Sequence, residues 1–344
     1  MVLAENMIRF LVATLLFTAC HETRTAPPKA APSVQGKTAT QPVAERRVVT
    51  FAGTCDASGA VELDERHVLV ADDENNVLRI YDTERGGAPR RELDLSAEFQ
   101  RAGIEKTEVD LEAGTRLNDK AYFLASHGRT SKGKRDDDRL VFFAIRASLD
   151  ESAAPVMVGQ PYRSLLDDLL NEPRLARFGL GEAALLAPKA PGGLNLEGLV
   201  ATSSGTLLMG FRNPVPEGRA LLVGISNPEE VLGGARAKLT DPIQLDLGGL
   251  GIRAMSSWHS SILILAGPSG EGGPFRLYRF DGQSAVVPLA ADLSELNAEA
   301  IFAHEARNDI VVLSDDGSVD IDGKPCKKHK ESARKSFRGL WLTP

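Results

Sequence analysis

Apolar and polar residues alternate in short runs along most of this chain. The runs are rich in Val, Ile, Leu and Phe, and turns of Gly, Asp, Asn and Ser separate them from about residue 46 onward. This period of two is typical of β-strands that bury one face. Residues 162–187 are the exception, because Leu165, Leu166, Leu169 and Leu170 recur at helical spacing. The pattern therefore predicts an all-β body with one short helical insertion, at about residues 162–190.

Five segments of the body can be aligned column by column. Each has a first strand with an alternating polar pair, then a turn, then an apolar strand that ends in a polar turn. The first strands begin at Cys55, Val109, Leu194, Leu250 and Leu296, with spacings of 54, 85, 56 and 46 residues. A four-stranded propeller blade takes about 40 to 50 residues, and the helical insertion lengthens the second unit. We predict a β-propeller of five four-stranded blades, or six if an irregular blade escapes the alignment, with the insertion after the second blade.

A ring of blades has to be closed, because each repeat buries its faces only against its neighbours. The sequence offers a strand near Arg47–Phe51 and a terminal strand at Phe337–Leu342 as closing partners, and it favours Val319–Asp322 as the third strand of the fifth unit. Cys55 opens the first unit and Cys326 lies in the last, so ring closure makes them neighbours. Either a disulfide seals the ring or the two thiols stay separate.

The first twenty residues have the layout of a secretory signal. Arg9 precedes an apolar run from Phe10 to Phe17, and the segment closes on Thr18, Ala19 and Cys20. The string LFTAC resembles a bacterial lipobox, and this resemblance implies that Cys20 is lipidated. An ordinary cleaved signal with an incidental cysteine is the alternative.

Residues 21–45 are rich in Ala, Pro, Thr and Lys and lack apolar periodicity, so they are predicted to be a disordered tether. Residues 46–344 are then a single propeller domain. No second run of eighteen apolar residues follows, so the lipid on Cys20 is the expected link to the bilayer. We expect an exported protein that is lipid-anchored in the bacterial cell envelope, at the outer membrane, with its body facing the periplasm or the cell surface.

Composition and charge narrow the expected partners. The 344 residues are 42% hydrophobic and 25% charged, an ordinary globular composition, and the net charge is −7 with an isoelectric point of about 5.5. No basic field covers such a surface, which argues against nucleic acid as a partner. A small molecule, a metal ion or a protein is the expected partner.

The alignment also maps the central channel, because the first strand of each propeller blade lines it. Two positions two residues apart face the same side of a strand. The first column holds Asp56, Asp110, Asn195, Gly251 and Asn297, and the second holds Ser58, Glu112, Glu197, Arg253 and Glu299. The polar turns expected on the same rim carry Asp72, Asp73, Glu74, His127, Arg129, Arg212, Asn213, Ser269, Asp315 and Asp316.

Carboxylates that converge on one axis repel each other unless a cation or an arginine compensates their charge. Hard oxygen ligands suit calcium or magnesium rather than zinc or copper, and calcium is the expected cofactor if a cation is bound. The predicted metal or ligand site comprises Asp56, Asp110, Glu112, Asn195, Glu197, Asn297 and Glu299. Arg253 stands in the same column, so a structural ring of ion pairs that ties the blades together is the alternative.

Catalytic candidates are few. His127 can transfer protons near the carboxylates, with Glu197 as the second candidate, whereas a histidine bonded to the backbone of its turn is the alternative. Because arginine offers a planar fork to carboxylate or phosphate, an anion-binding rim is expected from Arg129, Arg212, Asn213 and Arg253. No GxSxG, P-loop, HExxH or GxGxxG motif occurs in a suitable context, so nucleophilic and nucleotide-binding classes lose support.

Several strings resemble one bacterial family. They are CDASGAV with VADDENNVLRIY, ASHGR, GLNLEGL, GFRNPVPEGRALLV, LGIRAM, and AGPSG with FRLYRFDG, spread from about residue 51 to 343, and they are similar to the propeller-like domain-of-unknown-function 3616 family. That family brings no established reaction. More distantly, the EGL-type first strands resemble esterase-like phytase and calcium-dependent lactonase propellers, in which channel-lining acids hold metal. Only Glu112, Glu197 and Glu299 carry over as such acids, and Arg253 departs from an all-acid ring.

Two functions from different classes follow. The first is a membrane-anchored lipoprotein whose propeller binds a small ligand or a protein at the channel mouth, with or without calcium. The alternative is a metal-dependent hydrolase of phosphoesters, lactones or other esters. In that mechanism Glu112, Glu197 and Glu299 hold the cation, His127 acts as acid or base and Arg212 holds the anion. A purely structural envelope protein is a third hypothesis. The lack of a complete catalytic constellation favours binding, and whether the protein is an enzyme stays open.

Overall fold

The computed structural model describes residues 45–149, 155–283 and 285–343. The predicted signal, the lipidation site Cys20 and the tether up to residue 44 lie outside the described residues. The sequence predicts that the tether ends at residue 45, but the first strand already begins there. Among the described residues, no helix is both long enough and apolar enough to cross a membrane.

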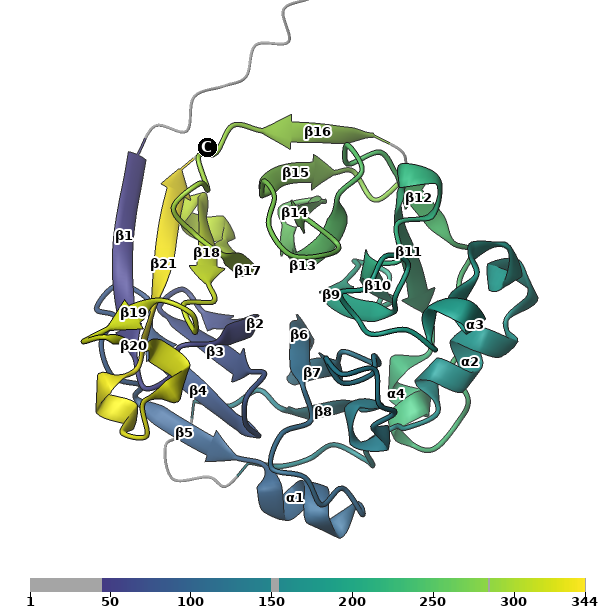
Figure 1. The fold of residues 1–344 in the computed structure, drawn as a ribbon, viewed down its shortest axis with the longest axis horizontal. Coiled ribbons are helices and arrows are strands. Elements are labelled where there is room, and N and C mark those ends of the chain that lie inside the picture. The colour runs from purple at the N-terminus through teal and green to yellow at the C-terminus, as the bar shows by residue number, and fades with distance from the viewer. Residues whose placement is uncertain (1–44, 150–154, 284, 344) are drawn as a thin grey trace, which may run out of the picture. The chain divides into compact units, whose positions relative to one another are not determined.

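Five small antiparallel sheets are arranged as blades around a central axis (Figure 1). In blades one to four the chain starts at the innermost strand and proceeds outward, and the innermost strands of neighbouring blades are in contact. From the inner to the outer strand, the blades consist of β2 (Ala57–Asp64), β3 (His67–Asp72), β4 (Val77–Asp82) and β5 (Arg91–Asp94); β6 (Leu111–Leu117), β7 (Lys120–Ala125) and β8 (Phe142–Arg146); β9 (Asn195–Ala201), β10 (Leu207–Asn213), β11 (Ala220–Ile225) and β12 (Ile243–Leu245); β13 (Gly251–Trp258), β14 (Ser261–Gly267), β15 (Arg276–Phe280) and β16 (Val286–Leu289); and β17 (Ala298–His304), β18 (Asp309–Ser314), β21 (Ser336–Thr343) and β1 (Glu45–Ala52). The prediction of a five-bladed all-β propeller is confirmed, and the described residues contain no sixth blade.

The second blade departs from the four-stranded pattern. Its sheet has only three regular strands, and its outer edge is completed by the irregular segment 156–162. Val158 N donates to Ala144 O at 2.8 Å, and Tyr162 N donates to Phe142 O at 2.7 Å. The prediction of four strands in every blade is therefore wrong for this blade, because its fourth segment turns toward the helical insertion after a few bonds.

The fifth blade closes the ring with strands from both ends of the chain. β1 pairs with β21 from Glu45 opposite Thr343 to Ala52 opposite Ser336, so the predicted closing partners are confirmed. The prediction of a third strand at Val319–Asp322 is wrong, because β19 (Asp320–Ile321) pairs instead with β20 (Lys324–Pro325) in a separate hairpin. β21 takes that place because Phe337 and Leu340 to Leu342 bury far more apolar surface than a four-residue segment with two aspartates.

The hydrophobic core is divided into five wedges, one between each pair of neighbouring blades. Every residue of β10, for example, is buried. Strands covered on both faces are typically continuous apolar runs rather than alternating ones. The second strands therefore read as LLM or VVL in the sequence, and the polar positions are concentrated at the ends of the innermost strands.

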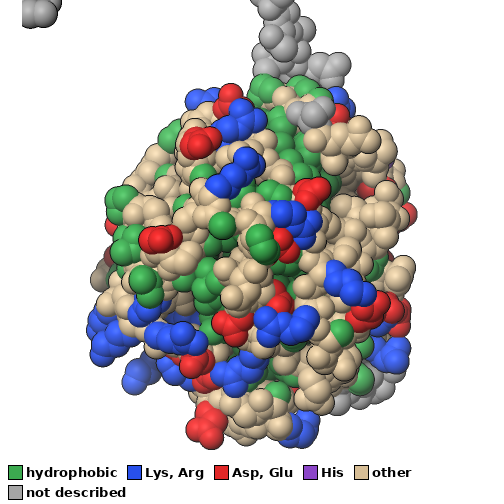
Figure 2. All heavy atoms as spheres, turned by 90° about the vertical axis from the view of Figure 1, so that its right-hand side faces the viewer, with side chains coloured by type: hydrophobic (Ala, Val, Ile, Leu, Met, Phe, Trp, Pro, Cys, Tyr) green, Lys and Arg blue, Asp and Glu red, His purple; other side chains and the backbone are tan. Residues whose placement is uncertain are grey.

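The predicted helical insertion lies between the second and third blades. It consists of α2 (Leu165–Asn171), the 3-10 helix η2 (Pro173–Phe178) and α3 (Leu180–Ala183). Its residues Leu165, Leu169, Leu175 and Leu180 pack into the wedge between these blades, whereas Leu170 is exposed. Elsewhere only short helices occur in the described residues, namely α1 (Ser96–Arg101), α4 (Pro228–Leu232), η1 (Asp137–Arg139), η3 (Pro216–Gly218), η4 (Glu305–Arg307), η5 (Cys326–Lys328) and η6 (Ser332–Arg334). Figure 2 shows basic and acidic side chains interspersed over one outer side of the molecule.

Candidate functional site

The same β-bulge recurs at the start of the innermost strand of every blade. In blade one, Ala57 pairs with Asp72 and Gly59 with Ala71, which leaves Ser58 without a partner in the ladder. The residues skipped in the five blades are Ser58, Glu112, Glu197, Arg253 and Glu299. A bulge bends its strand and re-aims the side chain of the extra residue. The second predicted column is therefore the set of bulge residues, and all five are buried.

A cavity of about 610 Å³ lies at the mouth of the channel, on the side where the innermost strands begin. Six of the seven predicted metal or ligand residues line it, and Asp56 does not. Eight carboxylates and five basic side chains line the cavity, which leaves a formal excess of three negative charges. They are Asp73, Glu74, Asp110, Glu112, Glu197, Glu271, Glu299 and Asp315, with Arg139, Lys189, Arg212, Arg253 and Lys327.

One group of lining residues, called the compensated wall, consists of Glu197 and Glu299 with Arg212 and Arg253. Arg253 Nη1 lies 3.2 Å from Glu197 Oε2, and the other terminal nitrogen of Arg253 contacts Glu299. Arg212 Nη1 donates to Glu197 Oε1 at 2.8 Å. Arg212 also donates to the carbonyls of Pro268 and Gly270 at 3.1 and 2.8 Å, which fixes its position. Two guanidinium groups therefore balance two carboxylates in this wall.

A second group of lining residues, called the open wall, consists of Glu112 and Asp73. Glu112 is 8% exposed, and no side chain among the described residues donates to it. Burial, and then the charges of Glu197, Asp110 and Asp73, hold the pKa of Glu112 well above its usual range. Burial, and then Asp56 and Asp110, do the same to the pKa of Asp73, whose Oδ1 is buried without a hydrogen bond. The open wall thus contains two acids and no cation of its own.

Asp56 lies behind the cavity, in the seam between the first and fifth blades. Its backbone forms a bridge with Asp315, and the Asp315 side chain accepts a bond from Asn297 Nδ2 at 3.0 Å. A Cβ atom at Gly317 would lie 1.9 Å from Asp56 Oδ1, so only glycine leaves room for this carboxylate. Burial, and then Asp315, raise the pKa of Asp56 to about 8. Asp56 therefore does not line the cavity, although the equivalent Asp110, Asn195 and Asn297 do, and its part in a ligand set stays a prediction.

The three glutamates of the second column lie close enough together to be compared with a calcium site. Oxygen atoms of Glu112, Glu197 and Glu299 lie within 4.8 Å of one another, a spacing that a calcium ion with ligands at about 2.3 to 2.6 Å can span. Arg253, however, contacts both Glu197 and Glu299, so a guanidinium already stands between two of the three carboxylates. A doubly charged ion placed there would face this fixed positive group. The residues therefore do not fit an ion that uses all three glutamates.

His127 stands apart from the carboxylates. It is 1% exposed, it does not line the cavity, and its Nδ1 lies 2.7 Å from the carbonyl of Ala125. Burial lowers the pKa of His127 to about 4, so the ring is neutral at pH 7. The structure does not support a catalytic role for His127 with Glu197, and it matches the alternative of a turn histidine bonded to the backbone.

The predicted anion-binding rim is not assembled either. Arg129 donates through Nε to Ala184 O at 2.9 Å, and Asn213 Nδ2 donates to Pro188 O and Ala190 O at 2.9 and 2.7 Å. These two residues therefore fasten the end of the helical insertion to the propeller. Arg212 and Arg253 do line the cavity, but both are already engaged by the glutamates. Backbone carbonyls and carboxylates therefore accept bonds from donors of all four residues, and anion binding at this rim stays a prediction.

Three basic residues of the cavity lie outside the aligned columns. Arg139 comes from η1 and pairs with Asp110 at 2.8 Å, Lys189 follows the helical insertion, and Lys327 pairs with Glu74 at 2.9 Å. Each lies in a connection that differs from blade to blade, so the repeat alignment contains no signal for it. The excess of carboxylates over basic residues in the aligned columns and turns is the one observation that predicts additional basic residues near the cavity.

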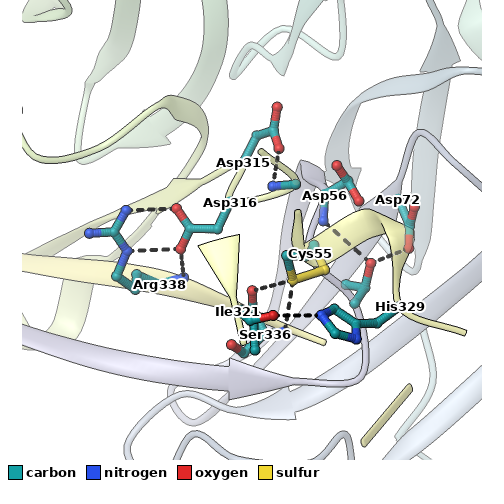
Figure 3. The surroundings of a disulfide bond; sticks show 12 residues. Cys55, Asp56, Asp72, Asp315, Asp316, Ile321, His329, Ser336 and Arg338 are labelled. Atoms are coloured by element: carbon teal, nitrogen blue, oxygen red, sulfur yellow. Dashed lines mark hydrogen bonds and ion pairs between the residues drawn. A yellow bond between two sulfur atoms is a disulfide. The ribbon is translucent and has the colours of Figure 1, made fainter. Parts of the chain in front are cut away.

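A disulfide joins Cys55, before the first blade, to Cys326 in the last, with their Cα atoms 6.0 Å apart (Figure 3). Asp316 N donates to Cys55 O at 2.8 Å, and Asp316 is held by Arg338 through bonds of 2.7 and 2.8 Å. His329 Nε2 lies 2.9 Å from the carbonyl of Ile321 in the same loop. These contacts fix the loop that carries Asp315 and Lys327 to the cavity.

Residues 141–309 match the family described as protein of unknown function (DUF3616). The resemblance is confirmed. No curated protein matches the chain. The fold of this chain is also similar to solved structures of low sequence identity.

Three of these structures illustrate the likeness. Glutaminyl cyclase from Myxococcus xanthus is 11% identical with a TM-score of 0.46, over 86% of this chain and 94% of that one. Exo-β-1,3-galactanase from Phanerochaete chrysosporium is 8% identical with a TM-score of 0.45, over 86% and 63%. The gluconolactonase XC5397 from Xanthomonas campestris is 10% identical with a TM-score of 0.39, over 87% and 90%. At these values the likeness concerns the fold and carries no argument about activity.

Proposed function

We propose that this protein binds a small polar ligand in the cavity at the channel mouth and performs no chemistry on it. The main support is a set of buried acceptors that lack donors. Asn195 is 3% exposed and its Oδ1 has no hydrogen bond, while its Nδ2 donates to Glu197 Oε1 at 2.5 Å. A buried polar atom left without a partner destabilises the fold by about 1 to 3 kcal/mol. A ligand that donates hydrogen bonds to Asn195 and Glu112 would remove this penalty.

The alternative, metal-dependent hydrolysis, has one observation in its favour, the approach of Glu112, Glu197 and Glu299. Two observations oppose it. Arg253 stands between two of these glutamates, and His127 is sealed away from the cavity. We therefore expect added calcium neither to raise the melting temperature nor to start hydrolysis of phosphoesters, lactones or other esters. Calcium-dependent turnover would favour the hydrolase instead.

The proposed function is tested by native mass spectrometry of the full-length protein after gentle extraction. We expect a bound small molecule in the wild type and its loss in Asn195→Ala and Glu112→Gln. Glu65→Gln is the matched control, because Glu65 is exposed at the opposite mouth of the channel. A bound molecule that survives both cavity variants would contradict the proposed site. A pull-down with the same variants tests whether the partner is a protein.

We also propose that Cys20 anchors this binding module in the cell envelope. The support is the sequence LFTAC after an apolar run. Cys20→Ser should move the protein from the membrane fraction to the soluble fraction and abolish labelling by a fatty acid. An unlabelled wild-type protein in the soluble fraction would instead indicate an ordinary cleaved signal.

A further inference from the structure

The charges around the cavity are distributed unevenly. Most of the lining carboxylates have a nearby cation: Glu197 and Glu299 meet Arg253, Asp110 meets Arg139, Glu74 meets Lys327, and Glu271 lies 3.8 Å from Lys189. Asp315 is bonded by Asn297. The two residues of the open wall, Glu112 and Asp73, have neither kind of partner among the described residues. The excess negative charge of the cavity is therefore concentrated in this wall.

A neutral side chain, the amide of Asn195, also lacks a hydrogen-bond donor in this part of the cavity. Asn195 lies at the start of β9, beside β6, which carries Glu112. Its free Oδ1 is a buried acceptor that lines the cavity without a donor. An amide oxygen has no charge to balance, so its need is specifically for a hydrogen-bond donor. Two kinds of acceptor, charged and neutral, thus lack donors in one cavity.

A single metal ion cannot act as the missing partner of all these acceptors. A metal ion requires oxygens that converge within a few ångströms of one point, and the only group of the described acids that does so is Glu112 with Glu197 and Glu299, where Arg253 already stands. Asp73 does not belong to that group. The cavity, at about 610 Å³, is also far larger than an ion. Separated acceptors in a large cavity instead match an extended ligand with separated donors.

We infer that the ligand is an organic cation with two or more amino groups, bound by Glu112 and Asp73 of the open wall and by the neighbouring Asn195. This inference rests on the proposed function and names the class of its ligand. Each ammonium group supplies three N–H donors and one positive charge, so it satisfies a carboxylate and a neighbouring amide oxygen together. The fixed guanidinium groups of Arg212 and Arg253 repel the cation and so favour its position beside Glu112 and Asp73.

Binding of such a cation should depend on pH. Glu112 faces Glu197 from β9, Asp110 before β6, Asp73 after β3 and Arg253 from β13. A cation stabilises the ionised form of Glu112, so binding should release a proton and weaken as the pH falls. The number of protons released is measured by calorimetry in two buffers that differ in ionisation enthalpy.

The test is isothermal titration of the purified full-length protein with three amines, namely butylamine, 1,4-diaminobutane and spermidine. We expect the diamine or the triamine to bind at least about tenfold more tightly than butylamine, because a second charge-assisted contact contributes roughly 1.5 to 3 kcal/mol. Glu112→Gln and Asp73→Asn should each weaken this binding about tenfold or more. Glu65→Gln should leave it unchanged. Circular dichroism and melting curves confirm that each variant is folded.

Other outcomes would overturn the inference in distinguishable ways. If succinate or a neutral polyol binds in place of the amines, and Asn195→Ala abolishes that binding, the proposed function stands and the amine inference fails. If calcium alone binds and Glu112→Gln removes it, the ligand is a metal ion and the inference fails. If no amine binds at about 1 mM, and native mass spectrometry also finds no bound molecule, both the inference and the proposed function fail.

Discussion

Glu112 and Glu197 occupy equivalent positions in neighbouring blades and have opposite surroundings. Both are the bulge residue of an innermost strand, in β6 and β9, and both are buried. Glu197 meets Arg212 at 2.8 Å and Arg253 at 3.2 Å, whereas no side chain among the described residues donates to Glu112. The repeat determines where each side chain points. The neighbouring blades determine whether its charge is compensated.

This difference separates structural charge from charge available to a ligand. Removing one partner of a buried ion pair leaves an uncompensated charge, whereas neutralising an acid that never had a partner removes a penalty. The two walls should therefore respond in opposite directions to similar substitutions, and four measurements test this contrast.

The largest effect is expected at Arg253. Arg253→Met leaves Glu197 and Glu299 buried with one fewer cation, and the free energy of unfolding should fall by about 3 to 5 kcal/mol. Urea denaturation at pH 7 measures it. Adding Glu299→Gln to the same chain should restore part of the loss. A loss below about 1 kcal/mol would mean that the two walls do not differ in electrostatic coupling.

The disulfide should come next. It closes a loop of 271 residues, and Cys55→Ala with Cys326→Ala should lower the free energy of unfolding by about 2 to 4 kcal/mol. The disulfide also holds the segment that carries Asp315 and Lys327 at the cavity. Its removal should therefore weaken ligand binding there, while the Arg253 contacts persist. Mass analysis of non-reduced tryptic peptides should show Cys55 linked to Cys326. A free thiol at Cys55 in oxidised protein would contradict the pairing.

The seam behind the open wall should make stability pH-dependent. The pKa of Asp56 is raised to about 8, so the folded protein holds this proton more tightly than the unfolded chain does. The stabilising contribution of this proton is complete below about pH 4 and is lost as the pH rises toward 8. The free energy of unfolding of the wild type, measured relative to Asp56→Asn, should therefore be about 1 to 3 kcal/mol lower at pH 8 than at pH 4. The difference between the two melting curves across this range isolates Asp56 from the other titrating groups. Parallel curves would contradict the assignment.

The smallest effect compares the two glutamates directly. At pH 7 without ligand, Glu112→Gln should raise the free energy of unfolding by about 0.5 to 2 kcal/mol, because the raised pKa of Glu112 favours the unfolded chain, in which this acid ionises freely. Glu197→Gln should lower it, because two arginines lose part of their partner. Glu65→Gln should change it by less than about 0.5 kcal/mol. If both substitutions changed the free energy of unfolding in the same direction, the proposed difference in charge compensation between Glu112 and Glu197 would be contradicted.

Much of the fold could be predicted from the sequence. The five first strands, the closing strands at both ends and the helical insertion are local signals of period, turn residues and apolar runs. The third strand of the fifth blade could not be placed in this way, because Val319–Asp322 and Phe337–Leu342 both read as strands and only packing against β18 and β1 chooses between them. The outer edge of the second blade escaped prediction because its bonds are irregular.

The candidate site was predictable in part. The column of Glu112, Glu197, Arg253 and Glu299 follows from the repeat register, and the structure places all four in the cavity. The roles of His127, Arg129 and Asn213 did not follow, because their partners are backbone carbonyls that no side-chain pattern reveals. Asp56 does not line the cavity as its equivalents Asp110, Asn195 and Asn297 do, and its backbone bridge to Asp315 in the last blade is a contact that the repeat alignment does not reveal.

The sequence by itself determined a repeated strand pattern, a closure and a ring of polar positions, since these depend on residues close together along the chain. Only the tertiary structure decided which acids are neutralised. Arg253 forms ion pairs with Glu197 and Glu299 from a different blade, whereas none of the described cations forms an ion pair with Glu112. Charge compensation acts over a few ångströms between segments that are distant in sequence, so it becomes defined only when the five blades close around one axis.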